Sequence, residues 1–99
     1  MPHRISPRAE ADLDEIWLYV ATESSSIEIA DRLIDAITGN FLLLAGFPYA
    51  GRARDDDFGA GTRSFSTGEY VIVYSVEGSY VSILRVVHGK RDLEALFDR

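Results

Sequence analysis

The chain has 99 residues, no cysteine and a formal net charge of −6, and 46% of its residues are hydrophobic, so a single domain over residues 1–99 can bury its own core without disulfides. The missing thiolates exclude cysteine-based metal sites, redox centres and nucleophiles, and no segment resembles a signal peptide or approaches the roughly 18 apolar residues of a membrane span. The acidic balance argues against direct binding of RNA or DNA, and a cytoplasmic location is expected.

The N-terminal part of the chain predicts an extended segment followed by a helix. Residues 3–5 are the extended segment, and Ser6 with Pro7 gives an N-cap followed by proline at the first helical position. Apolar residues then recur on one face of a helix, at Leu13, Ile16, Trp17 and Val20. The acids are expected on the solvated faces, at Glu10, Asp12, Asp14 and Glu15.

A second helix is predicted after the serine run at residues 24–26. Ser25 and Glu28 have the spacing of a capping box. The apolar stripe of this helix consists of Ile29, Leu33, Ile37, Phe41 and Leu44. Gly46 is expected at the C-cap, and Pro48 cannot continue the helix. A short link between two such helices indicates an antiparallel hairpin.

The second half of the chain has the composition of strands. Residues 49–61 contain three glycines and the acidic run 55–57, which indicates a mobile connection and a solvated loop rather than a cation site. Three runs rich in Val, Ile, Tyr and Ser follow, at residues 63–67, 70–76 and 80–87. They predict a three-stranded antiparallel meander, and residues 92–97 are expected to add closing helical turns. The fold class is therefore α+β, with the hairpin packed on a small antiparallel sheet.

Both faces of the predicted sheet are apolar. In the middle strand, alternation separates one face from the other, with Tyr70, Ile72, Tyr74 and Val76 opposing Val71 and Val73. In the last strand, Val81, Ile83 and Val87 oppose Tyr80, Leu84 and Val86. A helical hairpin covers only one face, and a sheet that is apolar on both sides is typically covered twice. The second cover is expected from the C-terminal helical turns or from a partner protein.

The two histidines belong to no visible catalytic or metal-binding constellation. His88 can exchange protons near neutral pH, but no base, nucleophile or metal ligand accompanies it in the sequence. A structural turn is favoured for this segment, in which Gly89 permits the bend and Asp92 caps the next turn. His3 is too isolated to be paired with His88. We therefore expect no cofactor, no metal and no catalytic residue.

Four strings, in order, resemble the ParE toxins of the RelE/ParE superfamily. They are ISPRA at residues 5–9, DLDEI at residues 12–16, YVIVY at residues 70–74 and ILRVVHGKRD at residues 83–92. The resemblance implies the RelE/ParE-like fold and the toxin of a bacterial type II toxin–antitoxin system, of the kind linked to plasmid stabilization. It also implies a cognate antitoxin whose C-terminal segment wraps the toxin as helix and strand. A homodimer and a toxin–antitoxin hetero-oligomer are both compatible with it.

The superfamily divides by activity, and the resemblance is closer to ParE. RelE-type members cut messenger RNA on the ribosome, whereas ParE-type members inhibit DNA gyrase. Where the RelE pattern has an arginine after the first tyrosine of the third strand, this chain has Val71, which cannot hold a phosphate oxygen. Where that pattern has its C-terminal tyrosine, this chain has Phe97, which lacks a hydroxyl for acid–base work.

The resemblance thus implies a non-catalytic gyrase inhibitor that acts by protein–protein binding. The motif arginine of the family is kept as Arg91. Candidate residues for contact with the target, or for capping by antitoxin acids, are Arg63, Arg85, His88, Lys90 and Arg91. Two alternatives are retained: a ribosome-dependent endoribonuclease (an mRNA interferase), and an inactive homologue that only binds its antitoxin.

Overall fold

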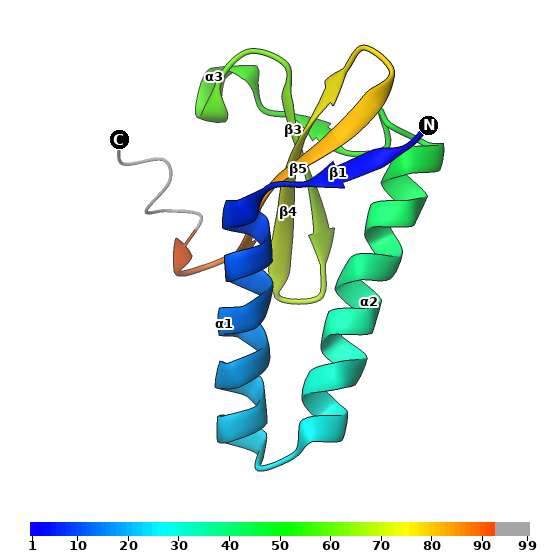
Figure 1. The fold of residues 1–99 in the computed structure, drawn as a ribbon. Helices are drawn as coiled ribbons and strands as arrows, with labels where there is room; N and C mark the ends of the chain where they lie inside the picture. Colours follow the sequence, from blue (N-terminus) through cyan, green and yellow to red (C-terminus); the bar gives the residue numbers. More distant parts are fainter. Residues whose placement is uncertain (93–99) are drawn as a thin grey trace.

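The structure has a helical layer and a sheet layer. The computed structural model describes residues 1–92. An antiparallel hairpin of α1 (Pro7–Ser24) and α2 (Ile27–Gly46) lies against a five-stranded sheet and extends past its end (Figure 1). The strands are β1 (His3–Ile5), β2 (Arg52–Ala53), β3 (Thr62–Thr67), β4 (Tyr70–Glu77) and β5 (Tyr80–His88). The predicted α+β fold and its C-terminal meander are therefore confirmed.

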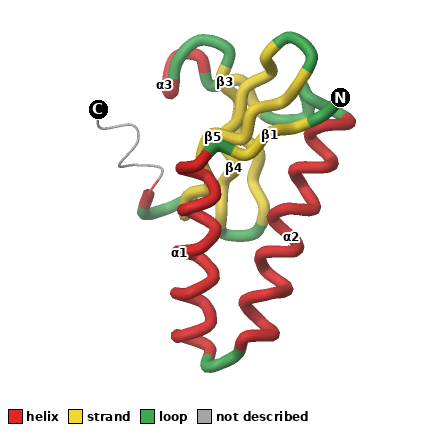
Figure 2. Tube along the Cα trace, viewed as in Figure 1, coloured by secondary structure: helices red, strands yellow, loops and turns green. Residues whose placement is uncertain are grey.

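The sheet is larger than the predicted meander. Its strand order is β1-β5-β4-β3-β2, and the tube view in Figure 2 shows the strands gathered toward the end of the hairpin that lies away from the link between α1 and α2. The N-terminal strand β1 pairs in parallel with β5, placing His3 opposite Val81 and Ile5 opposite Ile83. The other neighbouring strands pair antiparallel. The N-terminus thus lies beside the last strand of the sheet.

Serine side chains cap both long helices. The Ser6 hydroxyl accepts a 3.0 Å hydrogen bond from the Ala9 N–H, with proline next to the cap as predicted. The predicted Ser25–Glu28 capping box is wrong by one residue, because Ser25 ends α1 in the left-handed conformation with φ 54°. Ser26 is the N-cap instead, and its hydroxyl accepts from the Ile29 N–H. At the other end, Gly46 is the last helical residue rather than the cap.

The connection predicted over residues 49–61 contains regular structure, namely β2 and the short helix α3 (Asp55–Phe58). The buried Tyr74 hydroxyl donates to the Pro48 carbonyl at 2.8 Å and accepts from the Gly51 N–H at 2.9 Å. A Cβ at Gly51 would overlap this hydroxyl, so glycine is required there. The partners are 23 and 26 residues apart in sequence, and local composition does not reveal such contacts.

A β-bulge changes the phase of β5. Tyr74 lies opposite Ile83 and Val73 lies opposite Arg85, so Leu84 has no partner on β4. The predicted alternation holds in β4 but fails in β5 after this point. Val86 joins the core under the hairpin, whereas the sequence pattern placed it on the opposite face from Ile83.

The second face of the sheet carries a small valine cluster of its own. Val71, Val73 and Val87 are buried there, with Phe58 of α3 packed against them. The closing helical turns predicted at residues 92–97 are one expected cover for this face. Residues 93–97 of that segment lie outside the described residues. Apart from Met1, the large exposed apolar side chains of the described residues lie on the helices and on the segment after α2, at Leu18, Tyr19, Ile27, Ile29, Leu42, Leu43, Phe47 and Tyr49. Among residues 1–92, no helix has the length and apolar character needed to cross a membrane.

Candidate functional site

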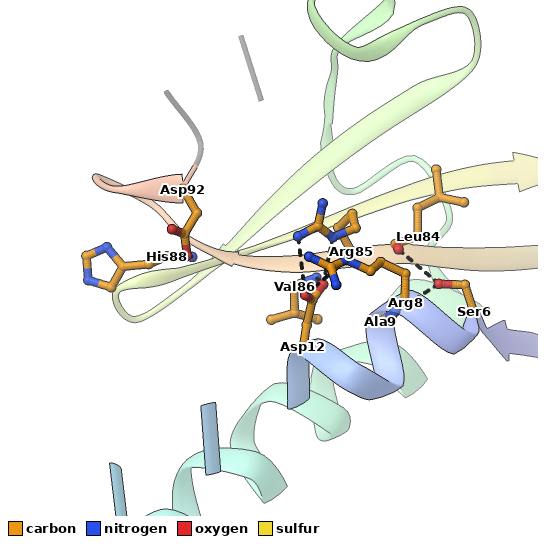
Figure 3. A network of polar contacts seen from close by, with 9 residues as sticks. All are labelled: Ser6, Arg8, Ala9, Asp12, Leu84, Arg85, Val86, His88 and Asp92. Atoms are coloured by element: carbon orange, nitrogen blue, oxygen red, sulfur yellow. Dashed lines mark hydrogen bonds and ion pairs between the residues drawn. The ribbon is translucent and has the colours of Figure 1, made fainter. Parts of the chain in front are cut away.

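Asp12 lies at the centre of a polar network between α1 and β5. Its side chain is only 4% exposed, and its Oδ2 accepts hydrogen bonds from Arg85 Nε at 2.8 Å and from the Val86 N–H at 2.9 Å. Its Oδ1 accepts from Arg85 Nη2 at 3.2 Å, and Arg8 Nε lies 3.9 Å away (Figure 3). The carboxylate thus holds Arg85 by a two-point contact and also satisfies a strand amide.

The solvated-face prediction for Asp12 is wrong. Asp12 lies three residues after Ala9 and four before Ile16, both buried, so it occupies the apolar stripe of α1. That position was the one signal in the sequence, because a charged residue inside an apolar stripe requires a buried partner. The partner is Arg85, which is 73 residues away. Arg85 is therefore engaged within the chain and is not a freely exposed cation.

The last residues of β5 lead into a turn, residues 88–91, which we call the basic turn. The backbone N–H groups of Lys90 and Arg91 both donate to His88 Nδ1, at 3.3 Å each. The His88 N–H donates to Asp92 Oδ2 at 3.1 Å, and the Gly89 N–H donates to the Glu69 carbonyl at 2.8 Å. The predicted turn at this position is confirmed.

These hydrogen bonds fix the chemistry of the His88 ring. A nitrogen that accepts two N–H bonds carries no proton, so a neutral imidazole here bears its proton on Nε2. In this tautomer, the Nε2–H is a hydrogen-bond donor. The ring packs edge-on against Tyr70 with centroids 5.5 Å apart, and Figure 3 shows it directed away from the Asp12–Arg85 contact. His88 is thus suited to donating a hydrogen bond to a ligand.

A hollow separates the basic turn from α1. It has a volume of about 270 Å³ and is lined by Glu15, Ile16, Tyr19, Tyr70, Arg91 and Asp92. The Arg91 guanidinium lies 5.5 Å from the centre of the Tyr19 ring, a cation–π contact at the surface. Burial raises the pKa of the Tyr70 hydroxyl, an effect that the positive charge of Arg91 opposes. Tyr70 therefore stays neutral at physiological pH.

Arg63 is not part of this cluster. It lies on β3 opposite Tyr74, whereas the basic turn begins at His88, which lies opposite Tyr70 on β4. Its Nη2 donates to the Tyr49 carbonyl at 3.2 Å, its Nε donates to the Gly51 carbonyl at 3.1 Å, and its guanidinium lies over the Tyr49 ring. Arg63 therefore anchors the segment between α2 and β2. Of the five candidates, the basic turn brings together His88, Lys90 and Arg91, whereas Arg85 is bound to Asp12 and Arg63 to the Tyr49 and Gly51 carbonyls.

The acidic run at residues 55–57 forms the exposed helix α3. Asp55 accepts from the Gly61 N–H at 2.6 Å, and Asp57 pairs with Arg54 at 3.2 Å. His3 packs near Phe41, with ring centroids 6.2 Å apart. Within residues 1–92, no group of three or more His, Asp or Glu side chains is arranged to hold a metal ion.

Comparisons with known proteins agree on one family. The family model described as the ParE toxin of the type II toxin–antitoxin system parDE matches residues 4–93. The chain is 34% identical over 94 residues to Toxin ParE1 of Caulobacter vibrioides, covering 95% of each protein. It is 33% identical to Toxin ParE3 of the same organism, covering 85% of this chain and 82% of that protein.

Solved structures show the same fold. A chain of the chromosomal ParDE system of P. aeruginosa aligns with a TM-score of 0.77 at 23% identity, covering 89% of this chain and 95% of that one. A chain of the RelBE2 toxin–antitoxin complex of Mycobacterium tuberculosis aligns with a TM-score of 0.57 at 25% identity, covering 88% and 95%.

Proposed function

The chain belongs to the ParE toxin family of type II toxin–antitoxin systems, and on that premise we propose that it inhibits DNA gyrase by binding it through the basic turn. Lys90, Arg91 and the Nε2–H of His88 supply the contacts. Arg85 contributes from within the fold through its contact with Asp12, and Arg63 anchors the segment between α2 and β2. This function places the protein in the cytoplasm with its target and requires no catalytic residue.

The observation that carries the proposal is how the basic residues are engaged. Arg85 is held by the buried Asp12, and His88 Nδ1 is occupied by two amides. Val71, at the position where the RelE pattern has an arginine, is buried in the valine cluster with Val73. Messenger RNA cleavage needs groups that hold phosphate and move protons. A donor surface that binds a protein target fits this arrangement better.

We further propose that a cognate antitoxin neutralises the toxin by covering its exposed apolar side chains. Leu18 is 62% exposed on α1, and Leu42 and Phe47 are 67% and 68% exposed at the C-terminal end of α2. Exposed apolar side chains of this size favour an amphipathic helix as partner. The short edge strands β1 and β2 leave backbone groups for an extended segment of the same partner.

Parallel assays of gyrase supercoiling and of ribosome-bound messenger RNA test this function. Wild type is compared with the double variant Lys90→Ala/Arg91→Ala and with Arg32→Ala, which removes an exposed cation on α2. We expect the wild type to inhibit gyrase and the double variant to need a roughly 2- to 30-fold higher concentration, the range for two exposed charge pairs. Arg32→Ala should match the wild type. RNA cleavage with unimpaired gyrase would overturn the proposal.

A further inference from the structure

The edge of β5 is covered by β1 along only part of its length. β1 pairs with residues 81–83 of β5, and α1 begins just after it. Backbone groups beyond this point would ordinarily face solvent or a partner strand. Instead, the Leu84 carbonyl accepts from the Ser6 hydroxyl at 2.9 Å and the Val86 N–H donates to Asp12 at 2.9 Å. Side chains thus continue the hydrogen bonding where β1 stops.

Asp12 acts at the position where β5 bends. The bulge at Leu84 lets the next residue, Arg85, reach Asp12 on α1. The Asp12 carboxylate also accepts a hydrogen bond from the N–H of the following residue, Val86. This path places Val86 in the core under the hairpin and His88 opposite Tyr70. His88 Nδ1 in turn accepts hydrogen bonds from the N–H groups of Lys90 and Arg91, and these bonds shape the basic turn.

We propose that Asp12 is a positioning residue that fixes the second half of β5 and thereby the placement of the basic turn. The link to inhibition rests on the proposed gyrase function, whereas the link to the turn geometry stands without it. Asp12 does not touch the target. It acts through Arg85 and Val86, which connect α1 to residues 88–91.

The chemistry requires a carboxylate at this position. Asp12 Oδ2 accepts from two donors and Oδ1 accepts from a third. An asparagine has one acceptor oxygen, and its NH₂ group would face either Arg85 Nη2 or the pair formed by Arg85 Nε and the Val86 N–H. Donor would then meet donor in a buried site. Asp12→Asn, with nearly unchanged shape, therefore tests the positioning role.

The experiment compares wild type, Asp12→Asn and the matched control Asp14→Asn, an identical change at an exposed position of the same helix. Gyrase inhibition is measured well below the melting temperature, so that a loss of stability alone leaves the protein folded. Amide hydrogen exchange is measured at Lys90 and Arg91, and in the wild type also at Val86. The ¹⁵N shift of His88 Nδ1 reports whether this nitrogen still accepts hydrogen bonds.

For Asp12→Asn we expect the half-inhibitory concentration to rise about tenfold or more, and the amide exchange rates at Lys90 and Arg91 to rise by a similar factor. This factor corresponds to the loss of one charge-assisted hydrogen bond. The His88 Nδ1 signal should shift. Asp14→Asn should stay within about twofold of the wild type.

Two results would overturn the positioning role, and a third would overturn its link to inhibition. One is a folded Asp12→Asn with unchanged exchange in the basic turn and an unchanged His88 signal. Another is rapid exchange at Val86 in the wild type, which also decides the matter if Asp12→Asn does not fold. The third is full gyrase inhibition by Asp12→Asn alongside altered exchange, because the turn geometry would then not matter for binding. A wild type that fails to inhibit gyrase removes the proposed function, and the exchange data then decide the positioning role alone.

Discussion

Tyr74→Phe removes the hydroxyl that holds the segment between α2 and β2. The Tyr74 side chain is fully buried, and its hydroxyl bonds both the Pro48 carbonyl and the Gly51 N–H. Phenylalanine keeps the ring and leaves both backbone groups without this partner. Each hydrogen bond contributes about 0.5–1.5 kcal/mol net. The loss of both therefore predicts a decrease of about 1–3 kcal/mol in the free energy of unfolding. For a domain of this size, each kcal/mol lowers Tm by roughly 4–8 °C.

Urea denaturation followed by circular dichroism measures this change. The matched control is Tyr49→Phe, because Tyr49 is 71% exposed and its hydroxyl makes no hydrogen bond within residues 1–92. The control should stay within about 0.5 kcal/mol of the wild type. If Tyr74→Phe also stays within that margin at an unchanged m-value, the hydroxyl does not stabilise the segment and the argument is refuted.

Two further predictions concern pH and salt. Burial raises the pKa of the Tyr70 hydroxyl above its ordinary value of 10.0, against the opposing charge of Arg91. The contribution of this pKa shift to stability is therefore complete at pH values below 10.0 and is lost as the pH rises toward the folded-state pKa. Tyr70→Phe should therefore lose less stability than the wild type across this alkaline range, and equal slopes in denaturation experiments would contradict the assignment. The affinity of the proposed antitoxin complex should fall only modestly as salt is raised, because the contacts proposed for it are mainly apolar; a steep fall in affinity would show that charge pairing dominates.

Local sequence signals identified most of the elements. Ser6 and Pro7 marked the start of α1, and the periodic apolar residues of α1 and α2 predicted the hairpin. The β-branched and aromatic runs predicted the meander. These features follow from neighbours a few residues away, which is the range at which capping and periodicity act.

The predictions that are wrong concern features that depend mainly on contacts between distant segments. Asp12 and Asp14 are the same residue type two positions apart, yet one is buried and the other exposed, because the rotation of α1 over β5 decides which side faces Arg85. The bulge at Leu84 reversed the faces of Val86 and Val87, since one extra residue shifts every later side chain to the other side. The sequence does not predict helix α3, because its aspartates and the glycines that follow it at residues 59 and 61 favour loops.

The same contacts show why counting basic residues overstates the positive surface of this protein. Arg85 is neutralised by a buried carboxylate, and Arg63 is held by backbone carbonyls around Gly51. Within the basic turn, Lys90 and Arg91 are the remaining cations, and Arg91 already lies over Tyr19. Proteins that bind nucleic acid through its backbone make on the order of 6–10 phosphate contacts. A surface with two clustered cations on a chain of net charge −6 is better matched to a few acidic side chains of a protein target. Under the proposed function, α1 therefore contributes to recognition indirectly, because its buried Asp12 binds Arg85 on the strand that leads to Lys90 and Arg91.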